Sequence, residues 1–278
     1  MRTSYVIGVL GVLALWGCGS DSTAPAATLS DVQISADLAA STAPAVATNA
    51  SVFLGAEVGS GASSASMVRA AGTATCTVNS ASGLMTFSAE SHPDSISFTR
   101  TWEYFSDAGC ENAFDAAATD SIAFTASLLE VDNDPRFVAR ATSAWQLDVI
   151  GAPTLAGATT HVWNGAGTDA DTATHQTPGL DRTYSGAAFD TAANVTFPHP
   201  LNGATVPSSG TFTRWMTVTV THTTHGVHKV QTTSRHIVVT FNGATQVPLV
   251  VLDDSTGAHL LTCTLDLTAR RLIENSCH

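Results

Sequence analysis

The chain has 278 residues, 44% of them hydrophobic, and 11 basic against 23 acidic residues give it a formal net charge of −12 at pH 7. This length is enough for one domain with a substantial core. Only 10 basic residues follow Cys18, and Lys229 is the single lysine of the chain. The composition therefore excludes a basic stripe for binding nucleic acid or for docking on anionic lipid.

The chain begins with one positive charge and a short apolar run. Arg2 is the only charged residue before Asp21, and the 12 residues of Tyr5–Trp16 are mostly apolar. This run is too short to cross a bilayer as a helix, which needs roughly 20 residues. Charge and run together are typical of an export signal.

The end of the apolar run and the two residues after it carry a family resemblance. Leu15–Cys18 resembles the lipobox of bacterial lipoprotein signal peptides, although Trp16 stands where that family has a small residue. The resemblance implies that a peptidase removes residues 1–17 and that the sulfur of Cys18 receives a lipid anchor. Gly19 stands where the family's inner-membrane retention signal has Asp, so the resemblance implies the outer membrane, in its periplasmic or surface leaflet. An ordinary secretory signal with an incidental cysteine and an overlooked cytosolic start are the alternatives.

Residues 18–72 are predicted to form a lipidated tether with one short helix. Ser30 and Gln33 have the spacing of a capping box, which predicts a helix over residues 31–40. The alternative is disorder, because residues 43–72 are rich in Ala, Ser and Gly.

Residues 73–278 are predicted to form a single antiparallel β domain of about ten strands. Apolar residues recur there with a period of two, and turn residues recur every 10 to 15 positions. No strand alternates with a convincing crossover helix, which disfavours a parallel sheet. The fold class expected is therefore all-β.

One hairpin suggests the curvature of the sheet. A three-residue loop at 224–226 would place Val220 opposite Val230, whereas a shift by one residue would place Met216 opposite Arg235 and waste apolar area. We therefore expect the first register, with strands about a dozen residues long. Such lengths favour a bent sheet or half-barrel, with a β-sandwich as the alternative.

The four cysteines after Cys18 are expected to form disulfides in an exported protein. A hairpin turning around residues 269–271 would bring Cys263 opposite Cys277. Cys76 with Cys110 then follows by elimination.

Three histidines offer a candidate transition-metal site. The expected register places His222 opposite His228, with His225 in the turn between them, so three imidazoles could approach one ion. The competing interpretation is an exposed hairpin tip, because no nearby acid is available to orient the rings.

Two acidic segments offer oxygen atoms of the kind that calcium prefers. One carries Glu130, Asp132 and Asp134, and the other carries Asp169 and Asp171. Neither completes an EF-hand loop, and Asp is also an ordinary turn residue.

No common motif for a catalytic nucleophile or a phosphate loop occurs in the sequence. We therefore expect a monomeric, lipid-anchored protein of the cell envelope that acts as a non-catalytic binding or structural module for a hydrophobic small molecule or an envelope component. The alternative is a surface-anchored hydrolase that uses a metal held by the three histidines.

Overall fold

The computed structural model describes residues 28–57, 64–71, 74–87, 94–134, 137–177, 180–200, 206–224 and 227–278. Cys18 and the predicted signal peptide, residues 1–17, lie outside the described residues, as do the side chains of residues 51–76.

The described chain forms one helix and a sheet of thirteen strands. The elements are α1 (Asp31–Glu57), β1 (Ser64–Ala71), β2 (Ala74–Phe87), β3 (Asp94–Ser106), β4 (Gly109–Glu111), β5 (Ser121–Asp134), β6 (Phe137–Ile150), β7 (Thr160–Thr177), β8 (Leu180–Pro198), β9 (Ser209–Thr224), β10 (Val227–Phe241), β11 (Gln246–Asp253), β12 (His259–Asp266) and β13 (Arg271–Leu272). Every pairing is antiparallel, and strands pair in chain order except that β4 pairs only with β3.

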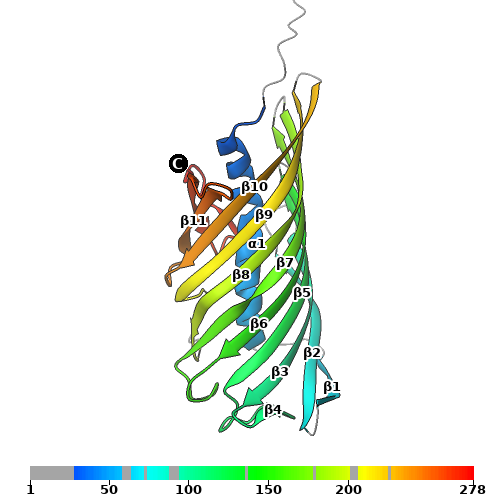
Figure 1. Ribbon diagram of the computed structural model, residues 1–278, viewed down its shortest axis with the longest axis vertical. Coiled ribbons are helices and arrows are strands. Elements are labelled where there is room, and N and C mark those ends of the chain that lie inside the picture. Colours follow the sequence, from blue (N-terminus) through cyan, green and yellow to red (C-terminus); the bar gives the residue numbers. More distant parts are fainter. Residues whose placement is uncertain are drawn as a thin grey trace, which may run out of the picture.

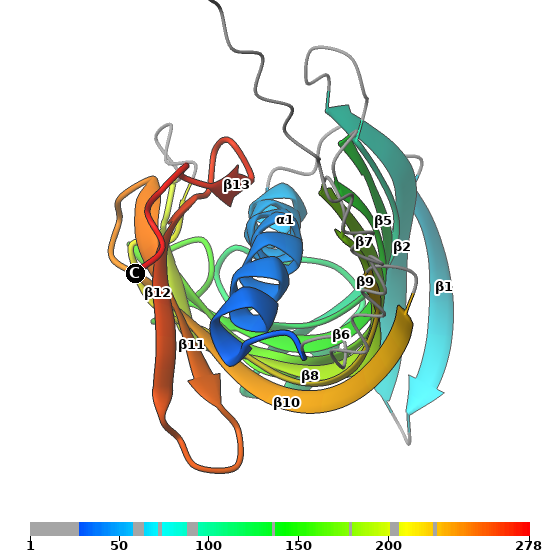
Figure 2. The same ribbon diagram turned by 90° about the horizontal axis from the view of Figure 1, so that it is seen from above.

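The sheet bends into an open half-barrel with α1 lying in its trough (Figures 1 and 2). Within the described residues β1 and β13 are the two ends of the strand order and do not pair with each other. One continuous sheet replaces the alternative of two packed sheets. The predicted all-β fold with a bent sheet and an N-terminal helix is thus confirmed, with more strands than the ten expected.

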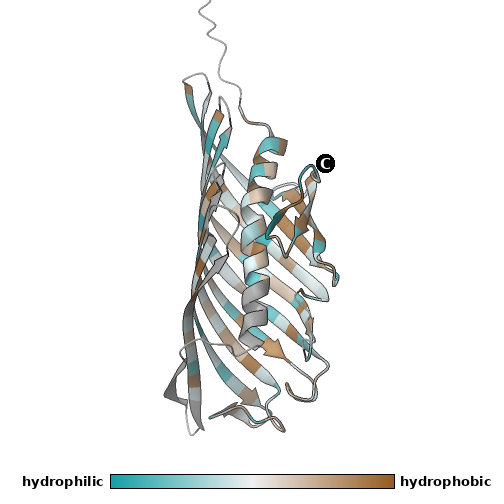
Figure 3. Ribbon diagram, turned by 180° about the vertical axis from the view of Figure 1, so that it is seen from behind, coloured by the Kyte–Doolittle hydropathy of each residue, from teal (hydrophilic) through white to brown (hydrophobic). Residues whose placement is uncertain are grey.

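The curvature goes with unusually long strands. β7 has 18 residues and β8 has 19, against about five or six for an ordinary strand. Buried and exposed residues alternate along β8, as expected when one face of a strand meets the core and the other meets water. Figure 3 shows the same alternation of hydrophobic and hydrophilic residues along several strands.

Helix α1 begins where the capping signal predicts and continues well past residue 40. The Gln33 amide donates to the hydroxyl of Ser30 at 3.2 Å, so Ser30 caps the helix. The helix then runs through Pro44 to Glu57, and residues 42–50 are buried without a break. A helical segment that is buried on all sides needs no amphipathic stripe, so the periodic apolar pattern of residues 42–50 is a weak helix signal. The sheet also starts earlier than predicted, at Ser64.

The predicted register of the β9–β10 hairpin is wrong by one residue. Val220 pairs with Gln231, and Met216 pairs with Arg235, in the arrangement that the sequence argument rejected. Val230, expected in the core, is 66% exposed.

The physical reason for this register is a charged partner that the hairpin sequence does not contain. Arg235 is buried opposite Met216 because its guanidinium reaches Asp31 of α1, with 2.5 Å between Nη2 and Oδ1. The same register buries Ile237 and Val239. No apolar area is wasted, since the next aliphatic residues along β10 supply it.

The apolar core lies between α1 and the concave face of the sheet. Trp145 of β6 is among its largest buried side chains, and it packs where Gly167 of β7 leaves room: a Cβ at Gly167 would lie 2.6 Å from the indole ring. Among the described residues, no helix combines the length and the apolar character needed to span a membrane.

Candidate functional site

The concave face of the sheet carries charged side chains as well as the apolar core. Five arginines are buried there or in the turn that borders it, namely Arg100, Arg182, Arg214, Arg235 and Arg270. They are half of the 10 basic residues that follow Cys18. Buried charges require partners, so the arrangement of these groups defines the candidate site.

Asp37 of α1 is the centre of the first group. Arg182 of β8 donates to its two oxygens, from Nε at 2.5 Å and from Nη2 at 3.2 Å. The hydroxyl of Tyr184 donates to the same carboxylate, and Gln33 donates to it at 3.1 Å. His175 Nδ1 lies 3.7 Å from Asp37 Oδ1. One carboxylate thus fixes the rotation of the helix against β7 and β8.

Arg214 of β9 is the centre of the second group. It donates to Asp190 through Nε at 2.8 Å and Nη2 at 2.9 Å, a bidentate geometry. Its Nη1 donates to Asp171 at 3.0 Å, and its Nη2 also contacts Asp169. A single guanidinium is therefore shared by three carboxyl groups on β7 and β8.

This excess of acid changes how the carboxyl groups titrate. Burial raises the pKa of Asp171 to about 7, and the charge of Glu130 adds to the rise. Burial also raises the pKa of Asp190 to about 8, with a further contribution from Asp171. Burial lowers the pKa of Arg214 to about 10. Asp190 and Asp171 therefore bind protons as the pH falls from about 8 to about 7.

A third group joins the two sides of the open sheet. Arg270, in the turn between β12 and β13, donates to Thr48 of α1 at 2.6 Å and also to Glu130 of β5. Thr48 donates to the same Glu130 oxygen at 2.8 Å. Burial raises the pKa of Glu130, which Arg270 opposes. These contacts run from the β12–β13 turn across α1 to β5. They therefore connect the two sides of the half-barrel, whose end strands among the described residues do not pair with each other.

The structure places His222 and His228, two of the three predicted metal-binding histidines, on opposite faces of the sheet. His222 is buried on the concave face and pairs with Lys229, not with His228. His228 is exposed on the opposite face, where its Nδ1 lies 2.9 Å from the hydroxyl of Thr223. His225 lies outside the described residues.

The predicted calcium loops are strands rather than loops. Asp169 and Asp171 lie within β7, facing Arg214, and Glu130 lies within β5, facing Arg270. The side chains of Asp132 and Asp134 lie outside the described residues. Within the part of the chain that the structure describes, no three His, Cys, Asp or Glu residues are placed to hold a metal ion.

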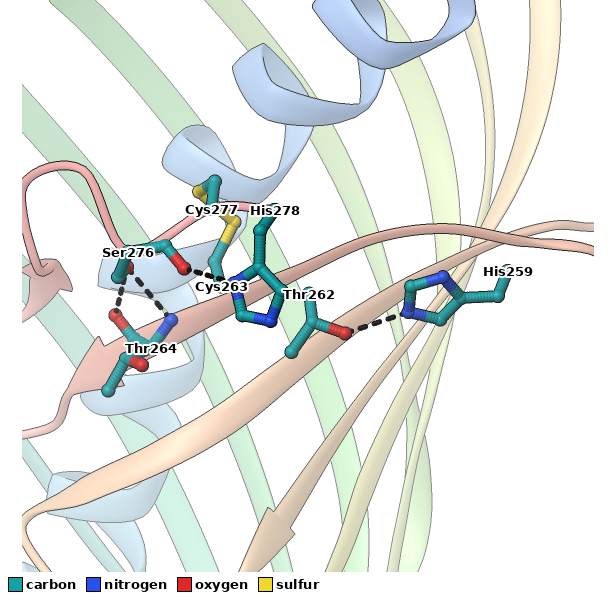
Figure 4. The surroundings of a disulfide bond; sticks show 7 residues. All are labelled: His259, Thr262, Cys263, Thr264, Ser276, Cys277 and His278. Atoms are coloured by element: carbon teal, nitrogen blue, oxygen red, sulfur yellow. Dashed lines mark hydrogen bonds between the residues drawn. A yellow bond between two sulfur atoms is a disulfide. The ribbon is translucent and has the colours of Figure 1, made fainter.

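The cysteines behave as expected where they are described. Cys263 and Cys277 form a disulfide with an S–S distance of 2.06 Å, as predicted. Figure 4 shows this bond beside hydrogen bonds that tie the C-terminal residues to β12, including Thr264 N to Ser276 Oγ at 3.0 Å. Cys110 is also disulfide-bonded, and the side chain of Cys76, its predicted partner, lies outside the described residues.

The buried ion pairs are not predicted by the patterns of the sequence. One signal for them was present: Arg214 lies between Phe212 and Met216 on the face of β9 that the pattern assigns to the core. A charge at an inward position of a strand indicates a buried partner. The partner itself lies on another element, so the hairpin sequence could not identify it.

The comparisons with known proteins add no relative to this picture: no family model matches the chain, and no similar curated protein or solved structure was found. The interpretation of the site therefore depends on its geometry.

Proposed function

We propose that this chain is a lipid-anchored protein of the bacterial cell envelope that serves as a non-catalytic binding or structural module. The leading support is the way α1 is held. Asp31, the first residue of this helix, lies 13 positions after Cys18, so α1 is the first described element that follows the predicted anchor. Asp31, Asp37 and Thr48 each bond to the sheet.

In this proposal the anchored helix α1 holds the sheet in a fixed position and orientation. The ion pairs at its first and second turns and the hydrogen bonds of Thr48 further along resist both sliding and rotation of the helix, because each contact has a directional geometry. The convex face of the sheet then faces outward, toward an envelope component. That face carries rows of hydroxyl groups, such as the pair Thr217 and Ser234 with 2.9 Å between their oxygens.

The polar groups inside the trough also favour a structural role over catalysis. The acids of the Asp37 and Arg214 groups contact arginines, and Arg270 holds Glu130 against the helix. These contacts position elements of the fold, which is the work expected of a buried network.

The test is to express the full chain in a bacterium with an outer membrane and to fractionate the cells. The expected result is protein in the outer-membrane fraction, with the native mass of residues 18–278 plus acyl chains. Cys18→Ala should abolish acylation, whereas the neighbouring Ser20→Ala should not. A soluble protein that keeps Met1 and an unmodified Cys18 would overturn the proposal.

A further inference from the structure

Arg100 of β3 differs from the other buried arginines. Arg182, Arg214, Arg235 and Arg270 each form an ion pair with a carboxylate. Arg100 is only 7% exposed, its Nε is buried without an acceptor, and no carboxylate of the described residues forms an ion pair with it. Burial of such a charge is costly unless a partner compensates it.

The immediate surroundings of Arg100 are aromatic and aliphatic. Its guanidinium lies over the rings of its strand neighbours, with 5.4 Å to the centroid of Phe98 and 5.9 Å to that of Trp102. Its partners on the adjacent strands are Ala81 of β2 and Ala126 of β5, both buried. The site therefore offers one positive charge within an apolar wall.

Two further hydrogen-bond donors lie on the same face of the sheet as Arg100. Asn79 is paired with Trp102 across the strands, and its Nδ2 is buried without an acceptor. The Tyr104 hydroxyl accepts a hydrogen bond from Trp102 Nε1 at 2.9 Å, which leaves its own hydrogen to donate. Three donors thus lie on one face of β2 and β3, and the described residues supply no acceptor for any of them.

We propose that Arg100, Asn79 and Tyr104 bind the carboxylate of an aliphatic acid whose apolar chain lies against Phe98 and Trp102. A single guanidinium balances a monoanion, and its planar fork matches the two oxygens of a carboxylate. The aromatic wall selects an apolar chain rather than a small inorganic anion. This assigns a ligand site beyond the anchored module proposed above, and its test does not depend on acylation of Cys18.

The test is calorimetric titration of the full chain, purified from whole-cell extract and held in an amphipathic polymer, with the polymer alone as blank. Decanoate, decanol and acetate are the probes. We expect decanoate to bind at least about ten-fold more tightly than either of the others, because only decanoate satisfies both the donors and the apolar wall.

Variants separate the carboxylate site from general apolar binding. Arg100→Met keeps the length of the side chain and removes its charge, and it should weaken decanoate binding at least about ten-fold while leaving decanol binding unchanged. Arg140→Met is the matched control, because Arg140 is exposed on β6, and it should bind decanoate like the wild type. If Arg100→Met does not fold, Asn79→Leu tests the same site with the charge retained.

The proposal is overturned if decanol binds the wild type as tightly as decanoate does. It is equally overturned if folded Arg100→Met keeps the decanoate affinity, or if Arg140→Met loses it to the same extent. None of these results bears on acylation of Cys18, so the two proposals fail separately.

Discussion

Two regions of the sheet hold α1 by different means. On the side formed by β7 to β10, carboxylates and arginines meet the helix and one another, as in the contact of Asp37 with Arg182. On the side formed by β11 and β12, the buried residues within the strands are mostly aliphatic, such as Leu249 and Leu265, and the disulfide of Cys263 closes the end of the chain. The charged contact on that side comes from the following turn, where Arg270 donates to Thr48 of the helix. Figure 2 shows the helix between these two sides.

The difference shows that the contacts that fix the position of α1 need not be those that stabilise it most. A buried ion pair gains little net free energy, because desolvation of both charges offsets their attraction, but it fixes one geometry. Burial of aliphatic side chains stabilises at about 25 cal/mol per Å² without any directional preference. We infer that the charged side sets where the helix sits, whereas the aliphatic side supplies much of the free energy that keeps it there.

The largest expected effect comes from removing the ion pairs of Arg214 on the charged side of the sheet. Arg214→Met leaves three carboxyl groups around an apolar side chain, and we expect the free energy of unfolding to fall by about 3–5 kcal/mol at pH 9, where Asp171 and Asp190 are ionised beside Arg214. Urea unfolding measures the change, with the exposed Arg140→Met as control. Equal stability of the two variants would contradict a structural role for the cluster.

The disulfide tests the aliphatic side. The double variant Cys263→Ala and Cys277→Ala removes a cross-link between residues 14 positions apart. We expect a loss of about 3 kcal/mol, since the unfolded chain gains freedom. Guanidinium unfolding should show the same loss at pH 5 and pH 8, because no titrating group is changed. A loss confined to one pH would disprove this reading.

The pH dependence of stability distinguishes the two sides further. Folded Asp171 and Asp190, with pKa values of about 7 and about 8, bind protons more tightly than they do when unfolded, where the pKa is near 3.8. The free energy of unfolding should therefore decrease as the pH rises from about 4 to about 8, because the folded protein holds these protons more tightly than the unfolded chain does. Thermal unfolding at a series of pH values measures it.

Matched variants sharpen this pH test. Asp190→Asn should flatten the pH profile between pH 5 and pH 8. Asp253→Asn should not, because hydrogen bonds from Ser255 and Thr256 lower the pKa of Asp253 to about 2, so that it stays ionised throughout this range. A profile that stays steep in Asp190→Asn would assign the effect to another group.

The smallest expected effect concerns the start of the helix. Ser30→Ala removes the cap on the Gln33 amide and should lower the free energy of unfolding by about 1 kcal/mol. Ser185→Ala, on the exposed face of β8, serves as the control in the same urea experiment. If both variants unfold alike, the cap contributes nothing in this setting.

Local patterns in the sequence were enough for several features of the fold. The period of two predicts antiparallel strands, Ser30 predicts the start of the helix, and the short hairpin predicts the pairing of Cys263 with Cys277. Each of these features depends on residues that are near one another in the chain, so a local sequence pattern contains the information needed to predict it. The bent sheet followed from strand length in the same way.

The tertiary structure alone decided the register of β9 with β10, the extension of α1 to Glu57 and the partners of the buried arginines. Arg235 finds Asp31, and Arg270 finds Glu130, only when elements distant in the chain fold against one another. No local pattern can encode these contacts, because the free energy of a buried charge depends on the group that neutralises it, and only the complete fold supplies that group.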